Sequence, residues 1–228
     1  MLFFRHVTEQ LKEDHVKIQL LIITLSFLNL FANSQTIMDV ARSNNITFYG
    51  IDFSNAKFSD FERYIKGTDT KENFATTLKE SYITYWSNYT AKANFQKYYK
   101  QIKINPEISQ SEKRNELINK NDMLTNTYYE ISPEKIKSII SEYNISGSGY
   151  GLLYIVESFD NYAQKIYIHV CYIKQSDKSI IATRRYIGRT DGKGIENFYA
   201  YGITHIIKQS SEDLLRYQHS KTRRKEYH

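Results

Sequence analysis

The stretch Gly188–Asn197, GRTDGKGIEN, combines glycines with side chains that can contact an anion. Glycine-rich loops that open a helix can present backbone N–H groups to a phosphate or carboxylate. The phosphate-loop motif of nucleotide-binding proteins is absent, because Lys193 is followed by glycine rather than by serine or threonine. A flexible connection between a strand and a helix is therefore the alternative interpretation. The residues of this candidate anion or ligand loop are Arg189, Asp191, Gly192, Gly194 and Asn197.

Basic residues next to this loop and near the C-terminus could add to anion binding. Arg184 and Arg185 precede the loop in a predicted strand, where successive side chains point to opposite faces, so at most one of them can join the site. The basic run Lys221–Lys225 predicts either a solvated tail or weak contact with anionic surfaces such as lipid head groups.

The remaining reactive side chains form no recognisable catalytic or metal-binding pattern. The six histidines lack metal-ligand spacing, and His169 and His205 fall in a predicted strand and helix as structural residues. Neither G-x-S-x-G nor H-E-x-x-H occurs in the chain. We therefore predict no cofactor and no metal, leave the catalytic residues unknown, and favour a function without catalysis.

An uncharged apolar segment near the N-terminus predicts export. Residues 18–32, IQLLIITLSFLNLFA, follow Lys17 and are shorter than the ~20 apolar residues of a spanning helix. They fit the apolar region of a signal peptide, and Ala32-Asn33-Ser34 provides a small-x-small site with cleavage after Ser34. The mixed charges before Lys17 suggest that translation begins at Val16. An uncleaved membrane anchor and a buried core helix are the alternatives.

The composition is that of a folded domain preceded by this leader. The 228 residues are 41% hydrophobic and 25% charged, which is typical of globular proteins. We predict a leader over 1–34, one domain over 35–209 and a basic tail over 210–228. The single cysteine, Cys171, excludes a disulfide framework and is expected to be buried. The net charge of +6 permits acidic partners, while export disfavours nucleic acid.

Hydrophobic periodicity predicts the helices and strands of this domain. Ser132-Pro133-Glu134 is a helix start with an N-cap serine and proline at the first helical position. Together the elements predict a two-layer α+β domain with a mainly antiparallel or mixed sheet, a C-terminal β-meander and packed helices. The predicted strands are 46–53, 98–104, 152–159, 166–173 and 179–187, and the predicted helices are 71–89, 111–119, 132–143 and 195–209.

Both ends of the mature chain resemble a group of uncharacterised secreted or periplasmic proteins of Bacteroidota. The first-strand signature is FYGIDFSNAKF at 48–58, and residues 143–209 share a Gly-flanked strand, a second strand, a Gly-rich loop and a helix containing Asn-Phe-Tyr-Ala at 197–200. Ile180 departs from the group's turn pattern, which has threonine there. The ending is also distantly similar to periplasmic domains of envelope accessory proteins, such as that of the curli pore. The resemblance implies fold and location, and no activity.

The sequence thus predicts an exported cell-envelope protein, periplasmic or secreted, that acts by binding or assembly. Its expected partners are a protein or a second copy of itself, with no membrane span left after cleavage. The alternative is a small ligand-binding protein or enzyme that uses the Gly188–Asn197 loop.

Overall fold

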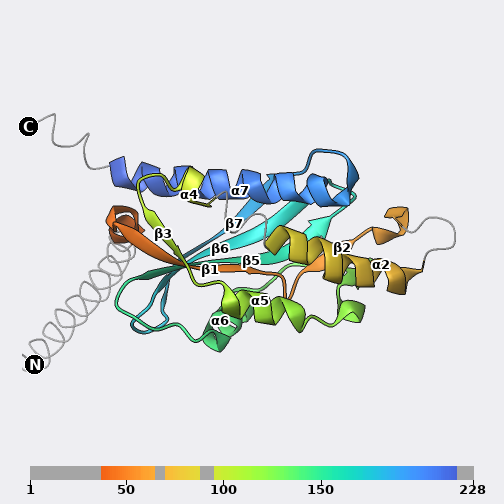
Figure 1. The fold of residues 1–228 in the computed structure, drawn as a ribbon, viewed down its shortest axis with the longest axis horizontal. Coiled ribbons are helices and arrows are strands. Elements are labelled where there is room, and N and C mark those ends of the chain that lie inside the picture. The colour runs from red at the N-terminus through yellow and green to blue at the C-terminus, as the bar shows by residue number, and fades with distance from the viewer. Residues whose placement is uncertain (1–36, 65–69, 88–94, 220–228) are drawn as a thin grey trace, which may run out of the picture.

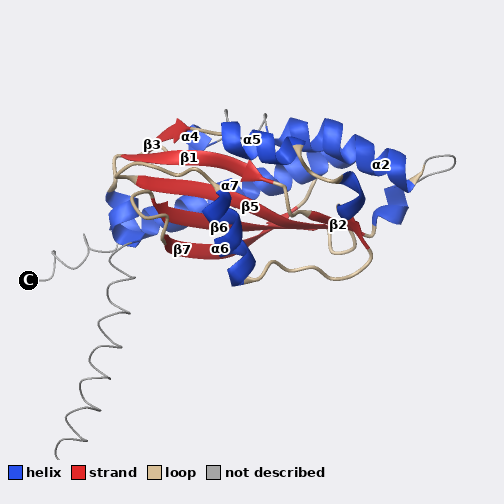
Figure 2. Cartoon of the chain, turned by 90° about the horizontal axis from the view of Figure 1, so that it is seen from below, coloured by secondary structure: helices blue, strands red, loops and turns tan. Residues whose placement is uncertain are grey.

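A twisted sheet runs along the molecule, and helices cover both of its faces (Figures 1 and 2). The computed structural model describes residues 37–64, 70–87 and 95–219, so the predicted leader, its cleavage site and the basic run Lys221–Lys225 lie outside the described residues. The strands of the described part are β1 (Asn45–Asp52), β2 (Lys57–Ser59), β3 (Lys103–Pro106), β4 (Leu124–Thr125), β5 (Tyr150–Asp160), β6 (Lys165–Lys174) and β7 (Ile180–Arg189).

Helical segments connect and cover these strands. The α-helices are α2 (Lys71–Thr77), α4 (Phe95–Tyr98), α5 (Ser109–Glu116), α6 (Pro133–Glu142) and α7 (Gly194–His219). A π-helical segment, η2 (Leu78–Ile83), continues α2, and η1 (Phe61–Tyr64) and η3 (Lys120–Asp122) are short 3-10 turns. None of the described helices is both long enough and apolar enough to span a bilayer.

The predicted α+β class with a mainly antiparallel or mixed sheet is wrong, because the sheet is mostly parallel along the path β3-β1-β5-β2-β4. β1 and β2 lie end to end along one side of β5, with Thr47 opposite Gly151 and Lys57 opposite Ser158. β3 and β4 extend this parallel part outside β1 and β2. The helices pack around the sheet, so the arrangement is α/β. Strands of two or three residues are too short to show a hydrophobic period, which hid β2 and β4 in the sequence. The strand predicted over 98–104 overlaps β3 only at Lys103 and Ile104.

The C-terminal strands lie where their apolar runs predict them. β5, β6 and β7 pair antiparallel on the other side of β5, with Leu153 opposite Cys171 and His169 opposite Arg185. β5 is therefore the central strand, with parallel neighbours on one side and an antiparallel neighbour on the other. Cys171 is buried as predicted, and burial raises the pKa of its thiol to about 12.

Side chains of β5 alternate between two cores. Tyr154 and Val156 pack in the larger core with α7 and the aromatic residues of α2 and α4, while Leu153 and Ile155 pack in the smaller core under α6. A strand buried on both faces reads as a continuous apolar run rather than as an alternation. This burial makes β5 the rigid element from which the candidate site is built.

Helix boundaries agree only in part with the periodicity. The Ser132 hydroxyl accepts a hydrogen bond from the Lys135 N–H at 3.2 Å, which confirms the predicted N-cap of α6. The predicted helix over 71–89 is instead interrupted by the π-helical segment η2. The last helix continues beyond its predicted end at Gln209 to His219, because Leu214 is buried against the larger core.

Candidate functional site

The strongest candidate site is a groove where three parallel strands end. β2, β4 and β5 end at Ser59, Thr125 and Asp160, and these three residues all line the groove. Ligands of open α/β sheets bind outside the carboxyl ends of the parallel strands. The volume is about 360 Å³, at the small end of ligand-binding cavities. The lining residues are Ser59, Asp60, Glu62, Thr125, Asn126, Thr127, Tyr128, Tyr129, Ser158, Asp160, Tyr162 and Tyr167.

The groove and the two termini of the described chain lie on opposite sides of the molecule. In Figure 1, β2 lies toward the right, whereas the first described helical residues and the end of α7 lie at the left.

Short polar contacts join the strand ends under the groove. Asn161 Nδ2 donates to the Asp60 carbonyl oxygen at 2.9 Å, and Asp160 Oδ1 accepts from the Ala163 N–H at 2.9 Å. Asp60 has φ 51°, in the left-handed region where asparagine and aspartate are enriched among residues other than glycine. The end of β2 is thereby held against the turn between β5 and β6.

Four tyrosines give the groove an aromatic wall. Tyr128 and Tyr162 are 75% and 77% exposed, among the most exposed large side chains of the described residues. Two others already face cations within the protein: the Arg185 guanidinium lies 4.2 Å from the ring centre of Tyr167, and Lys57 Nζ lies 5.7 Å from that of Tyr129. Such contacts reflect the negative face of an aromatic ring.

Three of these tyrosines, Tyr128, Tyr129 and Tyr167, have a raised pKa and are neutral hydrogen-bonding groups near pH 7. The hydrogen bond from the Tyr128 hydroxyl to Glu130 Oε2, 2.8 Å, raises the pKa of Tyr128. Burial raises the pKa of Tyr129 and of Tyr167, with further contributions from the charges of Glu157 and Asp160 respectively. Each of these phenols therefore keeps its proton; Tyr129 and Tyr167 can donate a hydrogen bond to a ligand oxygen, whereas the Tyr128 hydroxyl donates to Glu130.

A buried carboxylate, Glu157, holds the segment that carries two of these tyrosines. Its Oε2 accepts from the backbone N–H of Ile131 at 3.1 Å and contacts His169 Nε2 at 2.8 Å. Its Oε1 accepts from Arg185 Nε at 3.0 Å and Nη2 at 2.6 Å. Burial raises the pKa of Glu157, but the hydrogen bonds from His169, Arg185 and Ile131 outweigh it, so the pKa lies below its ordinary value.

A β-bulge in β5 turns Ser158 to the same side of the strand as Glu157, which shares its face with Leu153 and Ile155 by ordinary alternation. The register of β5 against β6 shifts between Val156 and Ser158, so Glu157 has no partner residue in β6. Val156 and Phe159 both pack in the larger core, which leaves the two residues between them to face the other way. Ser158 consequently lines the groove, while Glu157 reaches Ile131. Bulges often re-aim a side chain in this manner near functional sites.

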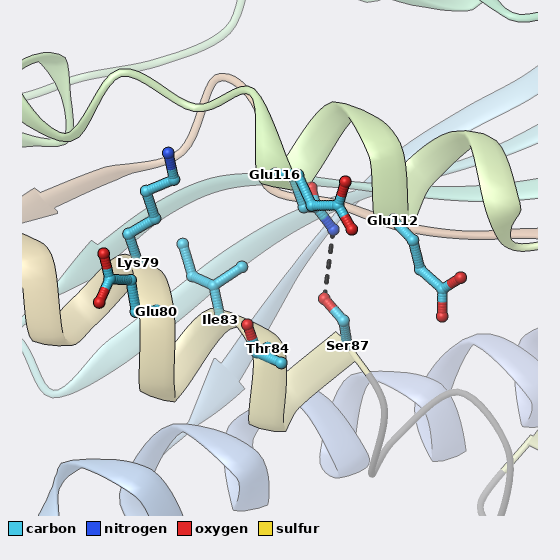
Figure 3. Close-up of a pocket in the computed structure, with 8 residues that line it drawn as sticks. Lys79, Glu80, Ile83, Thr84, Ser87, Glu112 and Glu116 are labelled. Carbon is cyan, nitrogen blue, oxygen red and sulfur yellow. Dashed lines mark hydrogen bonds between the residues drawn. The ribbon is translucent and has the colours of Figure 1, made fainter.

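A second cavity, of about 420 Å³, lies between the π-helical segment η2 and α5. Figure 3 shows Glu112 and Glu116 projecting from α5, with Glu80 and Thr84 on the facing helix. Four charged residues line it, three of them acidic, and its apolar contribution is Ile83. These are outward-facing side chains of two neighbouring helices, so this slot is a weaker candidate than the groove.

The polar residue at the base of this second cavity has a structural role. Asn115 Nδ2 donates to the Ile51 carbonyl oxygen at 2.9 Å, and its Oδ1 accepts from the Phe53 N–H at 2.8 Å. The same amide donates to Ser87 Oγ at 3.2 Å, the dashed line in Figure 3. Asn115 thus satisfies the backbone where β1 ends, and its polar atoms are engaged within the protein.

The loop predicted from sequence lies at the same end of the sheet, but two strands away from the groove. Arg189, at the end of β7, is opposite Lys165 at the start of β6. Asp191 Oδ1 accepts from the Gly192 N–H at 2.7 Å, and Asn197 Nδ2 donates to the Lys193 carbonyl oxygen at 3.3 Å. Gly192 and Gly194 have φ of 118° and 77°, so the glycines serve the turn into α7. None of the five predicted residues lines the groove.

Arg184 and Arg185 do point to opposite faces, as predicted for neighbouring residues of a strand. Arg184 bonds Asp213 of α7 at 2.5 Å, whereas Arg185 bonds Glu157 on the side of α6. Neither reaches the loop, so neither completes an anion site there.

The groove residues were missed because they come from the least periodic part of the sequence. Tyr128 and Tyr129 follow the two-residue strand β4, and Asp160-Asn161 is a dipeptide typical of turns, at the connection from β5 to β6. The available signal was the Tyr128-Tyr129 pair in a polar segment before the N-cap of α6.

The prediction that His169 is a structural residue is confirmed, because its Nε2 contacts the buried carboxylate of Glu157. Across the described ranges no three side chains of histidine, cysteine, aspartate or glutamate come together as a metal site. The groove can therefore offer hydrogen bonds, carboxylate charge and ring faces to a ligand.

Comparisons with known proteins add little to this geometry. Neither a family model nor a curated protein matches the sequence. One solved structure, of a Xanthomonas campestris protein from the family DUF330, matches 55% of this chain and 70% of its own at 12% identity and a TM-score of 0.23. A likeness at this TM-score supports no conclusion about the fold or the function of this chain.

Proposed function

We propose that this chain is an exported protein of the cell envelope that acts by binding rather than by catalysis, and that the groove is its binding site. Export rests on the uncharged segment 18–32 and the small residues after it. The observation that carries the binding role is the groove, a concave surface with exposed tyrosines at the carboxyl ends of β2, β4 and β5.

The composition of the groove supports binding over nucleophilic catalysis. The described lining residues include no cysteine, and no histidine or lysine that could act as a base for Ser59 or Ser158. The nearest histidine, His169, is bonded to Glu157, which also holds Arg185 and the Ile131 N–H. These charged groups position the groove and are engaged with one another.

Site-specific photo-crosslinking in the native host tests the location of the site. A benzophenone amino acid replaces Tyr162 in the groove or, as the matched control, Tyr217 near the end of α7. Both positions are exposed tyrosines, 77% and 40%. We expect a discrete adduct from position 162 and none from position 217. Adducts from 217 alone would overturn the groove as the binding site.

Fractionation of the same cells tests export. The processed chain should be found outside the inner membrane and begin at Gln35. A cytoplasmic chain that retains residues 18–32 would contradict export without affecting the test of the groove.

A further inference from the structure

We infer that the groove binds an organic cation, an ammonium or guanidinium group on a short hydrocarbon stem. This inference rests on the proposed function of the groove and adds the chemical class of its ligand. The source of such a group is either a free amine or a basic side chain of a peptide, and both present the same chemistry.

The first argument is charge. The described lining residues carry three carboxylates, those of Asp60, Glu62 and Asp160, and neither lysine nor arginine. The chain as a whole carries a net charge of +6, so an acidic lining stands out against its surroundings. Clefts lined by charge of one sign concentrate ligands of the opposite sign.

Among the described cations near the groove, Lys165 lies opposite Asp160 in the register of β5 and β6, whereas Arg185 and Lys57 are engaged with other groups. Arg185 is paired with the buried carboxylate of Glu157, 2.6 Å from Nη2 to Oε1. Lys57 donates to the Asp122 carbonyl oxygen and approaches Tyr129 from outside the described lining set. A further carboxylate, Glu130, accepts the hydroxyl proton of Tyr128 beside the groove.

The second argument is aromatic and independent of the carboxylates. The rings of Tyr167 and Tyr129 already have cations over them, at 4.2 and 5.7 Å, which shows that tyrosine faces at this site accept positive charge. Tyr128 and Tyr162 add two largely exposed rings to the same wall. Aromatic walls combined with carboxylates are the usual means of binding alkylammonium groups.

The size and the ligand geometry favour an organic cation over a metal ion. A volume of about 360 Å³ accommodates a small amine or one or two side chains. The carboxylates of the described residues do not converge as a three-ligand metal set. The stem of an alkylammonium ion, in contrast, can contact the rings while its charge faces Asp60, Glu62 or Asp160.

Isothermal titration calorimetry at low salt tests this inference on the chain as isolated from cells. The probes are 1,5-diaminopentane, the tripeptide Gly-Lys-Gly with blocked ends, and the neutral analogue 1,5-pentanediol. We expect saturable binding of the diamine or the peptide and none of the diol. The probe with the higher affinity identifies the source of the cation.

Variants locate the binding within the groove. Tyr162→Leu keeps apolar bulk and removes the ring face, and should weaken binding by about threefold to thirtyfold. Glu62→Gln should weaken it at low salt and have less effect at high salt, because exposed charges are screened. Glu116→Gln, in the cavity between η2 and α5, is the charge-matched control and should change nothing.

Three results would overturn the inference: no binding of either cation, equal binding of the diol or a neutral sugar, or affinity unchanged by both groove variants. If a cation fails to bind but the crosslink from position 162 persists, the ligand class alone is wrong. If the crosslink is lost as well, the groove is not the site.

Discussion

Two buried carboxylates, Asp52 and Glu157, are held in similar ways but fix different parts of the molecule. Both side chains are 0% exposed, and each is paired with one arginine, Arg114 or Arg185. Asp52 is the last residue of β1 and Glu157 lies three residues before the end of β5, and each strand is parallel to a neighbour. The difference lies in their third partner.

The Asp52 cluster connects elements of the scaffold to one another. Asp52 Oδ2 accepts from Arg114 Nε at 2.8 Å and from the Tyr143 hydroxyl at 2.9 Å, which links β1, α5 and the residue after α6. Arg114 also bonds Glu142 at 2.6 Å. Burial lowers the pKa of Arg114, but Asp52 and Glu142 outweigh it and raise the pKa overall. Burial, followed by the charge of Asp52, raises the pKa of Tyr143.

The Glu157 cluster instead holds a connection that carries side chains of the groove. Its third partner is the backbone N–H of Ile131, two residues after Tyr129. Similar charge chemistry thus produces a scaffold contact in one place and a support for the site in the other. The element that the third partner belongs to, α6 and its end for Asp52 and the connection before α6 for Glu157, therefore distinguishes the two roles.

Arg114→Met should give the largest loss of stability. The variant leaves Asp52 buried with its charge uncompensated, so we expect a loss of about 3–5 kcal/mol in the free energy of unfolding. Urea denaturation measures it. Arg216→Ala is the control, because the Arg216–Asp213 pair is on the surface and contributes at most about 1 kcal/mol. A loss for Arg114→Met no larger than that of the control would contradict the scaffold role.

Glu157→Gln should cost less stability but affect the groove. The amide can still accept from the Ile131 N–H, while Arg185, 27% exposed, loses its counter-charge and is partly hydrated. Loss of a charged hydrogen bond predicts about 1.5–3 kcal/mol in urea denaturation.

The unpaired Arg185 then adds positive charge beside Tyr167, so cation binding should weaken at low salt and recover in part at high salt. Arg114→Met, measured at a temperature where it remains folded, should bind the cation normally. Equal effects of the two variants on binding would break the distinction between scaffold and site.

Low pH should remove the contribution of the Glu157 charge to the free energy of unfolding. Folding lowers the pKa of the Glu157 carboxyl, so its charge stabilises the folded protein at pH values above the pKa of the unfolded chain, about 4.3 for glutamate. This contribution is lost as the pH falls through the pKa of the folded protein. The stability difference between the parent chain and Glu157→Gln should be full at pH 7 and shrink below about pH 4.3. Thermal unfolding at several pH values measures it. A difference that does not depend on pH would show that the charge of Glu157 is unimportant.

Tyr143→Phe should have the smallest effect. It removes one hydrogen bond from Asp52, which keeps Arg114 and the Ser54 N–H at 2.7 Å. We expect a loss of about 1.5 kcal/mol in the free energy of unfolding and unchanged cation binding. A loss as large as that of Arg114→Met would mean that the phenol, rather than the arginine, holds the buried charge in place.

Local patterns predicted the elements that are long and periodic. The apolar runs located β1, β5, β6 and β7, and the Ser132-Pro133 start located α6, because these signals depend on residues that are close in the chain. The same patterns failed for β2 and β4, which have three and two residues, and placed the start of the strand corresponding to β3 about five residues too early. Since those short strands provide the parallel pairing, the fold class was predicted wrongly.

The predicted Gly188–Asn197 loop and the proposed groove lie at the same end of the sheet but on different connections. The Gly188–Asn197 loop contains the glycines and charges that motif reasoning seeks, yet its polar side chains bond within the loop. The groove combines residues from three connections separated by up to about a hundred positions, such as Ser59 and Asp160. Such a set has no local spacing to detect.

The sequence alone determined the apolar cores, the buried cysteine, the N-cap of α6 and the alternation of Arg184 and Arg185, because each depends on neighbouring residues and a fixed backbone period. Only the tertiary structure decided that β1 and β2 lie parallel to β5, that Glu157 sits in a bulge and reaches Ile131, and that four tyrosines and three carboxylates share one groove. These features depend on pairings between distant short segments, whose stability comes from the sheet and cores as a whole rather than from any segment by itself.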